Sequence, residues 1–380
     1  MKFAIAGAGF SGAVLGRRLA EAGHHVDIVD ERSHVAGNCH TERDADTGVL
    51  IHRYGPHIFH TDNERVWAYI TRHGDMIDFQ HTVKTTVEGR VYTLPVNLLT
   101  INQLYGLSLS PSEAVDFIEN ERIEIAEPAN FEEQALSMVG PRVYAAFLRG
   151  YTRKQWGREP SELPASILKR LPLRFNYEDS YFNHPHQAIP RHGYTEIVAS
   201  ILDHPLIEVS LGQHFAPGDA DGYDHVIWTG PLDAWFGYDE GHLAYRTLDF
   251  EEIRAAGDFQ GCSVMNYGDE DVPFTRISEH KHFAPWETHE KTIAFREFSR
   301  AAGEGDIPYY PIRLADDQAL LDRYLARGRA QEGVSFVGRL ATYRYLDMDG
   351  IIGEALSAAD KLLERVAAGE PIDPFFIDPT

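Results

Sequence analysis

The feature that most constrains the fold is a set of three glycines near the start of the chain, Gly7, Gly9 and Gly12, which directly follow a short apolar run. A stretch of helical character, 13–22, and a second apolar run that ends at Asp30 come next. This order predicts a strand, a tight turn, a helix and a second strand. Glycine permits the turn, the approach of a pyrophosphate and close helix–strand packing. The segment is therefore predicted to bind a dinucleotide, with Asp30 placed to bind ribose hydroxyls.

The residues after the second apolar run favour FAD over NAD as that dinucleotide. Glu31 and Arg32 are followed shortly by Gly37 and Asn38, and a strand–glycine–helix unit returns over 334–368. Flavoproteins that bind extended FAD use two such units, because a second helix N-terminus can face the flavin while the first faces the pyrophosphate. A plain turn at Gly37 and Asn38 is the alternative interpretation of that pair.

Charge and cysteine content narrow the possible partners. Lys+Arg 35 against Asp+Glu 58 gives a net charge of -23, so the surface as a whole repels nucleic acid and anionic membranes. An anionic substrate must therefore be held by a few local arginines. The cysteines, Cys39 and Cys262, support no disulfide framework and suit a reducing cytoplasm. No apolar run approaches the roughly 18 residues of a membrane helix, and the N-terminus is interpreted as a strand and not as a signal peptide.

A chain of 380 residues suggests two or three domains, and the patterns along it favour a discontinuous arrangement. Alternation over 81–96 predicts a hairpin around the turn 88–90. Capping signals at Ser110 and Asn130 open a helical region. The predicted fold is α/β: a discontinuous Rossmann-like FAD-binding domain over 1–80, 190–235 and 300–380, an inserted helical bundle domain over 98–170, and an antiparallel β-sheet substrate domain over 81–97, 171–189 and 236–299.

Local patterns predict further elements within this plan. Asp62 is expected to cap the helix that follows it. Alternation is expected to resume over 174–189, and 193–202 has a helical period. The runs 206–209 and 225–228 are expected to form buried strands.

The stretch 54–60 places two histidines on a loop with a sharp Gly–Pro turn. Such a loop can lie against a planar cofactor, with His57 near the reactive edge. As metal ligands, His57 and His60 would join His52, but no carboxylate or cysteine stands at a matching spacing. A purely structural histidine is the remaining alternative.

Arginines and aromatic residues are interleaved through the middle of the chain: Phe147, Tyr151, Trp156, Arg170, Arg174, Phe175, Tyr177, Tyr181 and Phe182. The combination returns at Arg276, 309–310 and 343–345. Aromatic rings offer flat surfaces to a nucleobase, and the arginine fork binds a diphosphate. Core packing explains most aromatics taken singly, but in so acidic a chain the repeated pairing predicts a local anion pocket. Because the sequence shows no serine nucleophile elbow, zinc spacing or P-loop lysine, the chemistry is expected to come from the cofactor.

Seven sequence blocks, in order along nearly the whole chain, carry a resemblance to a known family. They are 7–12 (GAGFSG), 54–60 (YGPHIFH), 131–136 (FEEQAL), 150–157 (GYTRKQWG), 171–177 (LPLRFNY), 309–313 (YYPIR) and 338–349 (GRLATYRYLDMD). With these blocks the chain resembles the bacterial UDP-galactopyranose mutases. It departs from the family pattern at Ala36, where a double glycine is usual before Asn38, and in the loop 212–221.

The resemblance implies an isomerase that interconverts UDP-galactopyranose and UDP-galactofuranose with no net redox change. It implies FAD in the reduced form, whose N5 acts as nucleophile on the sugar anomeric carbon and displaces UDP. It further implies an external reductant such as NAD(P)H, a homodimer and a cytoplasmic location.

The same resemblance implies roles for three groups of residues, and no metal. Catalysis falls to Arg170, Arg276, His57, Tyr310, Tyr345 and Glu297, with the two arginines on the diphosphate and a lid near Arg170. The substrate is bound by Phe147, Tyr151, Thr152, Trp156, Tyr181, Phe182 and Asn266. The cofactor is bound by Gly7, Gly9, Phe10, Ser11, Gly12, Asp30, Glu31, Arg32, Asn38, His57, Ile58, Arg339, Tyr345, Asp347 and Met348.

Two competing interpretations belong to other classes. A flavin-dependent oxidoreductase of the amine-oxidase-like class would use the same cofactor domain but transfer electrons to an acceptor, and the arginine–tyrosine pocket argues against a hydrophobic amine as its substrate. A noncatalytic nucleotide-binding regulator would bind UDP without turnover and would lack the absorbance of a flavin.

Overall fold

The computed structural model describes residues 1–170, 173–312 and 315–379, without the side chains of 166, 169, 170 and 315–317. Its strands are β1 Lys2–Ala6, β2 His25–Asp30, β3 Thr41–Arg43, β4 Leu50–His52, β5 Phe59–Thr61, β6 Met76–Asp78, β7 Val83–Val87, β8 Arg90–Leu94, β9 His186–Pro190, β10 Ile207–Leu211, β11 His225–Trp228, β12 Tyr245–Ala256, β13 Val264–Tyr267, β14 Arg276–Glu279, β15 Lys291–Ala301, β16 Tyr310–Pro311 and β17 Val334–Phe336. Its α-helices are α1 Phe10–Glu21, α2 Glu64–His73, α3 Leu98–Tyr105, α4 Pro111–Glu121, α5 Phe131–Val143, α6 Gly150–Trp156, α7 Tyr194–Leu202, α8 Leu232–Trp235, α9 Ala315–Arg329 and α10 Met348–Ala368. The π-helix is η2 Tyr144–Arg149, and the 3₁₀ helices are η1 Gly37–Cys39, η3 Pro160–Glu162, η4 Ala165–Arg170, η5 Pro217–Ala220 and η6 His280–Phe283.

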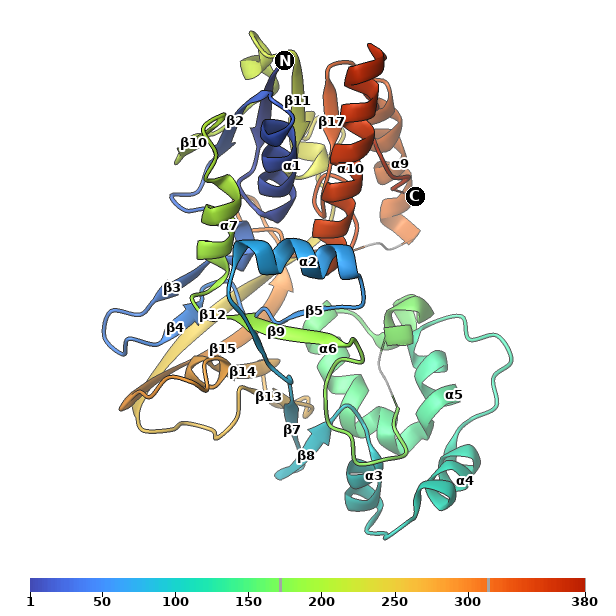
Figure 1. Ribbon diagram of the computed structural model, residues 1–380. Helices are drawn as coiled ribbons and strands as arrows, with labels where there is room; N and C mark the ends of the chain where they lie inside the picture. Colours follow the sequence, from blue (N-terminus) through green and yellow to red (C-terminus); the bar gives the residue numbers. More distant parts are fainter. Residues whose placement is uncertain (171–172, 313–314, 380) are drawn as a thin grey trace.

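A parallel five-stranded sheet, in the order β10-β2-β1-β11-β17, forms the upper part of the molecule in Figure 1. Successive residues of β1 point to opposite faces, because a strand has a period of two. Phe3 and Ile5 pack in the core with α1, α7 and α10, whereas Ala4 and Ala6 pack with α8 and α9. Helices thus cover both faces, as a parallel sheet requires. Since β17 and α10 join strands from the N-terminus, the predicted α/β fold with a discontinuous Rossmann-like part is confirmed.

The prediction that 206–209 forms a buried strand is wrong in its burial. The strand present here, β10, lies at the edge of the parallel sheet beside β2, and none of its residues is buried. An edge strand has a neighbour on one side only, so its apolar side chains stay partly open to solvent. The second predicted strand, β11, lies inside the sheet and is buried throughout.

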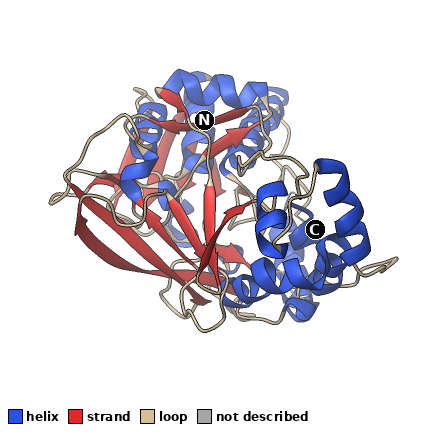
Figure 2. Ribbon diagram, turned by 90° about the horizontal axis from the view of Figure 1, so that it is seen from below, coloured by secondary structure: helices blue, strands red, loops and turns tan. Residues whose placement is uncertain are grey.

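A second sheet of seven strands, in the order β16-β12-β15-β14-β13-β7-β8, lies below the first. Its strands fan out on the left of Figure 2, and the inserted helices gather on the right. The sheet is built on β12 and β15, which pair antiparallel over eleven residue pairs. One pair, β13 with β7, is parallel, so the sheet is mixed and not purely antiparallel as predicted. The hairpin β7–β8 comes from a distant part of the chain, and no tight turn fixes its direction relative to β13.

The segment 174–189 forms one short strand and not the alternating strands predicted. Residues 173–185 contain neither helix nor strand, and β9 pairs with β5 and β6 in a separate three-stranded sheet. Backbone N–H groups of this loop donate to distant carbonyls, from Arg174 to Val96 at 3.0 Å and from Tyr181 to His81 at 2.7 Å. These isolated hydrogen bonds tie the loop to distant segments, and they do not form the regular ladder of a strand pair.

The helices predicted after residue 98 form the insertion at the lower right of Figure 1. Side chains of Asn97, Ser110 and Asn130 cap α3, α4 and α5 by accepting from backbone N–H groups, and Ser110 belongs to a full capping box. Gly140, with φ of 75°, breaks the helical path of α5 before Pro141. The insertion packs its apolar face against the hairpin β7–β8.

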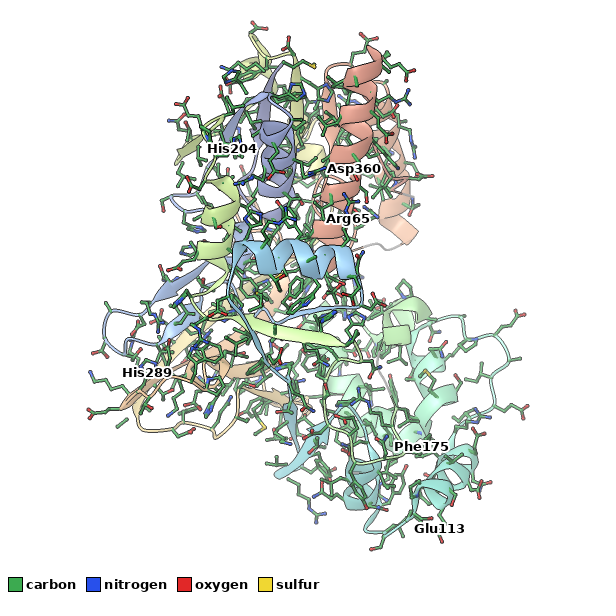
Figure 3. The ribbon with its side chains drawn as sticks, in the orientation of Figure 1. Arg65, Glu113, Phe175, His204, His289 and Asp360 are labelled. Atoms are coloured by element: carbon green, nitrogen blue, oxygen red, sulfur yellow. The ribbon has the colours of Figure 1, made fainter. Side chains whose placement is uncertain are left out.

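The first turn of α2 is capped by Asn63 and not by Asp62 as predicted. Asn63 Oδ1 accepts from the N–H groups of Arg65 at 3.0 Å and Val66 at 3.3 Å. Both residue types are good caps, so composition alone cannot choose between neighbours. On the outer face of α2, Arg65 pairs with Asp360 of α10 at 2.6 Å (Figure 3).

The C-terminal helix α10 is 21 residues long and packs along α1. It ends at Gly369, whose φ of 65° is typical of a left-handed helix cap. Within 1–170, 173–312 and 315–379, no helix combines the length and apolar character needed to cross a membrane.

Candidate active site

One large cavity, of about 1400 Å³, lies where the two large sheets and the helical insertion meet. Its lining runs from Ala6, at the end of β1, to Ile351, in the first turn of α10. Pockets for one drug-sized ligand reach roughly 1000 Å³, so this cavity has room for more than one such ligand. Among the predicted site residues with described side chains, all line it except Gly12 and Glu297.

The glycine turn forms one end of the cavity. Gly7 has φ of 113°, and a Cβ there would lie 2.1 Å from Thr229 Oγ1. Gly12 supports the turn from behind, where a Cβ would lie 2.0 Å from the Gly7 carbonyl oxygen. Gly9 is the N-cap of α1 and makes no side-chain cap, so the N–H groups of the first turn can bind an anion.

Asp30 shapes this turn through its carboxylate. Its Oδ2 accepts from the Ala8 N–H at 2.7 Å, and its Oδ1 accepts from the Arg32 N–H at 2.9 Å. Asp30 and Glu31 both line the cavity. Because a carboxylate oxygen can accept more than one hydrogen bond, Asp30 can still bind ribose hydroxyls.

Arg32 and Asn38 form the adjoining wall. Arg32 Nη2 donates to Asn38 Oδ1 at 2.9 Å, and the guanidinium lies 4.7 Å from the centre of the Tyr54 ring. Arg32 Nη1 is buried and has no acceptor among the described residues. A buried donor of this kind indicates a ligand acceptor that the protein itself does not supply.

Ala36, in the turn beside Asn38, has φ of 76° although it bears a side chain. A left-handed conformation costs roughly 1–2 kcal/mol for such a residue, and glycine avoids it. Ala36→Gly is therefore expected to raise the free energy of unfolding by about 0.5–1 kcal/mol after glycine's own entropic cost. Urea unfolding measures the change. Ala22→Gly, at an ordinary φ of -84°, is the control and is not expected to stabilise; equal changes in the two variants would contradict the prediction.

Arg339, Tyr310 and Tyr345 form a stack in the cavity wall. The two phenol rings lie 5.8 Å apart and nearly parallel, and the guanidinium lies 5.0 and 4.6 Å from their centres. Arg339 donates to the carbonyls of Tyr309 at 2.5 Å and Leu346 at 3.3 Å, and its buried Nε has no partner among the described residues. Burial raises the pKa of Tyr310, so its hydroxyl stays protonated and can donate to an anion.

Arg276 presents a guanidinium to the cavity from the start of β14. The sheet register pairs it with Glu297 of β15, and Arg276 Nε and Nη2 lie 2.8 and 2.7 Å from Glu297 Oε2. Thr275 Oγ1 donates to Glu297 Oε1 at 3.2 Å. Glu297 is 1% exposed and does not line the cavity. Its place behind Arg276 makes it a positioning residue for that guanidinium, whereas the resemblance implies a catalytic residue.

His57 lies in the cavity wall on the turn that follows β4. Its Nδ1 lies 2.8 Å from the Gly55 carbonyl oxygen, which can only accept, so Nδ1 carries the proton and Nε2 is left as an acceptor. Burial, helped by Arg339 and Arg276, outweighs that hydrogen bond and lowers the pKa of His57 to about 4. The ring is therefore neutral near pH 7. Ile58 lines the same wall.

The other end of the cavity is aromatic. Phe147 comes from the π-helix η2, an arrangement frequent at functional sites, and α6 supplies Tyr151, Thr152 and Trp156. Burial raises the pKa of Tyr151, which leaves its hydroxyl a donor. The remaining predicted substrate residues, Tyr181, Phe182 and Asn266, line the cavity from the loop before β9 and from β13.

Arg170 and its lid fall partly outside the described residues. The backbone of Arg170 ends η4, its side chain lies outside the described part of the chain, and so do residues 171 and 172. The predicted roles of Arg170 and the lid are therefore expectations from the resemblance alone.

Sequence reasoning missed several residues that line the cavity. His60 stacks on Phe182 with ring centres 3.7 Å apart, a contact that no sequence pattern marks. His81 lies two residues before β7, is 4% exposed and has a buried Nδ1 without a partner in the described chain. Thr229 follows β11, and its place in the turn after that predicted strand was the one sequence signal for it. Ile351 lies beyond the motif that ends at Asp349, so no pattern marks it.

The cavity fits an extended flavin dinucleotide by the chemistry of its donors. Its lining includes uncapped N–H groups at α1, buried guanidinium nitrogens on Arg32 and Arg339, and glycine backbones at Gly9 and Gly37. The N-terminus of α10, whose N-cap Asp347 makes no side-chain cap, lies in the same lining with Met348. Together these groups can hold a diphosphate and a planar ring.

A group with metal-ligand spacing lies outside the cavity. Side-chain atoms of Asp258, Glu279 and His282 lie within 4.8 Å of one another. Glu279 already accepts from the N–H groups of Phe259 and Gln260 at 2.9 and 2.8 Å, and His282 Nε2 lies 3.2 Å from Asp258. These three side chains therefore connect the loop after β12, which contains Asp258, to the end of β14 at Glu279.

Comparisons with known proteins agree with this geometry. Residues 146–345 match the family model described as UDP-galactopyranose mutase, and 5–72 match an NAD(P)-binding Rossmann-like domain. The chain is 54% identical to the probable UDP-galactopyranose mutase of Klebsiella pneumoniae, over 98% of this chain and 97% of the relative. It is 48% identical to the dTDP-fucopyranose mutase of Escherichia coli, over 96% and 99%.

Solved structures show the same fold at low sequence identity. A reduced UDP-galactopyranose mutase matches with a TM-score of 0.74 and 17% identity, over 99% of this chain and 98% of that one. A putative protoporphyrinogen oxidase from Exiguobacterium sp. 255-15 matches with a TM-score of 0.67 and 12% identity, over 96% and 99%. The identity and coverage of the sequence relatives show family membership as well as fold. The chain belongs to the UDP-galactopyranose mutase family.

Proposed function

We propose that the protein interconverts UDP-galactopyranose and UDP-galactofuranose, with FAD in its reduced form as cofactor. The observation that carries this proposal is one cavity that holds both a dinucleotide-binding turn and a separate group of arginine and tyrosine donors. The family membership supports the same reaction.

Reduced FAD, when bound, supplies an electron-rich ring nitrogen, N5, that can act as a nucleophile on the sugar anomeric carbon. The chain's own residues are proposed to bind the nucleotide sugar, orient it and shield it from water. Phe147, Tyr151 and Trp156 are proposed to hold the uridine, because flat rings stack on a base and the Tyr151 hydroxyl can donate. The cavity walls are proposed to keep bulk water away from the reacting sugar, which protects reactive sugar species from hydrolysis.

Departure of UDP places negative charge on the diphosphate, and Arg276 is proposed to stabilise it. In a site shielded from water a fixed guanidinium interacts with that charge far more strongly than it would in solution. Glu297 holds the guanidinium in place. Tyr310 and Tyr345 can donate further hydrogen bonds, and Arg170 is proposed to share the role on the resemblance alone.

A dTDP-linked sugar is the second candidate substrate, because a relative 48% identical is a dTDP-fucopyranose mutase. The substrates in the names of the two relatives differ in both base and sugar. Parallel assays with UDP-galactose and dTDP-fucose, each in pyranose form, discriminate between the candidates. A higher kcat/KM for dTDP-fucose would replace the UDP-sugar assignment and keep the reaction class.

The test of the reaction uses the purified protein with its bound flavin. UDP-galactofuranose is supplied, and chromatography follows its conversion with and without dithionite. Conversion is expected only after reduction, with no net oxidation of the sugar. Turnover by fully oxidised protein, or stoichiometric electron transfer to oxygen, would favour a flavin oxidoreductase, and UDP binding without a flavin spectrum would favour a noncatalytic binder.

Cellular context is proposed on the same basis. NAD(P)H is the proposed reductant, a homodimer the proposed assembly and the cytoplasm the proposed location. Reduction of the bound flavin by NAD(P)H under anaerobic conditions tests the first, and sedimentation tests the second.

A further inference from the structure

Two buried histidines, His52 and His280, lie behind the His57 turn. Their exposed fractions are 2% and 0%, and neither lines the cavity. His52 ends β4, and His280 opens η6 directly after β14. Burial of an imidazole costs hydration that hydrogen bonds offset. His280 Nε2 has no partner among the described residues, so the Nδ1 contacts of the two rings show what they do.

Each ring accepts a hydrogen bond from a backbone amide through Nδ1. The His57 N–H donates to His52 Nδ1 at 3.1 Å, and the His52 N–H donates to His280 Nδ1 at 3.2 Å. A nitrogen that accepts carries no proton, so both rings are neutral with the proton on Nε2. Burial lowers the pKa of both groups, in agreement with their neutral state.

The chain of acceptors connects His57 to the strand that carries Arg276. β14 begins at Arg276, which faces the cavity, and His280 follows the end of the same strand. On its other side the turn is enclosed, since a Cβ on Gly55 would lie 3.3 Å from Phe250 Cζ. The strand β14 therefore sets the place of both cavity groups.

We propose that His52 and His280 are positioning residues, whose Nδ1 atoms hold the His57 turn in register with Arg276. The inference rests on the proposed function in assuming that this turn faces the cofactor. Asparagine places Oδ1 close to the position of Nδ1 and keeps the acceptor, whereas leucine fills the space without one. The two substitutions thus separate the hydrogen bond from the packing.

The experiment compares His52→Leu with His52→Asn in the flavin-loaded protein, with His225→Leu as the matched loss of a buried histidine elsewhere. His52→Leu is expected to speed hydrogen exchange of the His57 amide at least tenfold, to shift the midpoint potential of the flavin and to lower kcat. His52→Asn is expected to restore all three to near the wild-type values. His225→Leu is expected to change none of them, whatever it does to stability.

Nitrogen NMR of the wild-type protein gives a second, independent measurement. Unprotonated Nδ1 and protonated Nε2 are expected for His52 and His280, and the reverse for His57. A protonated Nδ1 on His52, or unchanged exchange and potential in His52→Leu, would overturn the inference. If His52→Leu does not fold, His280→Leu and His280→Asn are compared in its place. Absence of mutase activity alongside the expected tautomers and exchange would reject the proposed function and leave the positioning role intact.

Discussion

Arg276→Ala is expected to lower turnover roughly a hundred- to a thousandfold, the loss typical of removing one donor that stabilises developing negative charge. Arg276 faces the cavity with its guanidinium fixed by Glu297. The effect belongs to kcat, because the diphosphate carries most charge when UDP departs; KM should also rise, but less. Steady-state assays with dithionite-reduced enzyme measure both constants, and flavin absorbance confirms that the cofactor is still bound.

The design must separate chemistry from folding, because Arg276→Ala also leaves Glu297 buried with its charge uncompensated. Breaking a buried pair costs roughly 3–5 kcal/mol. The double variant Arg276→Ala with Glu297→Gln removes the stranded charge and is expected to recover stability without recovering turnover. Arg300→Ala on the same sheet, where an exposed arginine pairs with Asp249 and Asp306, is the control with little expected change. Near wild-type turnover in the double variant would reject the role of Arg276.

The parts of the fold that sequence patterns predicted are those with short-range causes. The glycine turn, the helix caps at Ser110 and Asn130 and the hairpin β7–β8 each depend on residues a few positions apart. Where two neighbours satisfy the same rule, the pattern fails by one residue, as at Asp62 and Asn63. Edge position also escapes the pattern, because the apolar run of β10 is the same whether one strand or two lie beside it.

In the candidate site too, residues with a local signal were predicted, and residues placed by long-range contacts were not. Arg276 and most of the aromatic residues were marked by their types and line the cavity, whereas Phe175, Tyr177 and Tyr343 do not. The place of Glu297 depends on the register of β14 and β15, which sets it directly opposite Arg276 across 21 positions of sequence. No local pattern encodes that register. Likewise, the bond from His52 to His280, which extends the link from His57, joins residues 228 positions apart, and only the folded sheet shows it.

Mild acid is expected to destabilise the protein strongly, because several histidines are buried in neutral form. Burial lowers the pKa of His225 to about 4 and that of His81 and His280 to about 3. In the unfolded chain these groups titrate near 6.5. Between about pH 4 and 6.5 the unfolded chain therefore binds more protons, and the free energy of unfolding falls as the pH falls through that window.

Each of these three groups contributes about 1.4 kcal/mol of destabilisation between pH 7.5 and 5.5, or roughly 4 kcal/mol together. That is a large part of the roughly 5–15 kcal/mol that stabilises a typical domain. His282 opposes the trend: its contacts with Glu279 and Asp258 raise its pKa, so its contribution is complete below about 6.5 and is lost as the pH rises through its folded pKa. One such group offsets only part of the loss.

Urea unfolding at pH 5.5, 6.5 and 7.5, followed by circular dichroism, measures this slope. His225 supplies a clean probe, since it begins β11, and its Nε2 donates to Ser335 Oγ of the neighbouring strand β17 at 2.8 Å. The Ser335 hydroxyl donates its own proton to the Asp373 carbonyl. His225→Gln keeps an N–H donor near that place but cannot titrate. It is expected to remove about 1.4 kcal/mol of the loss between pH 7.5 and 5.5 while changing stability little at pH 7.5. A slope equal to that of the wild-type protein would show that His225 titrates in the folded state, and that its burial does not govern the response to acid.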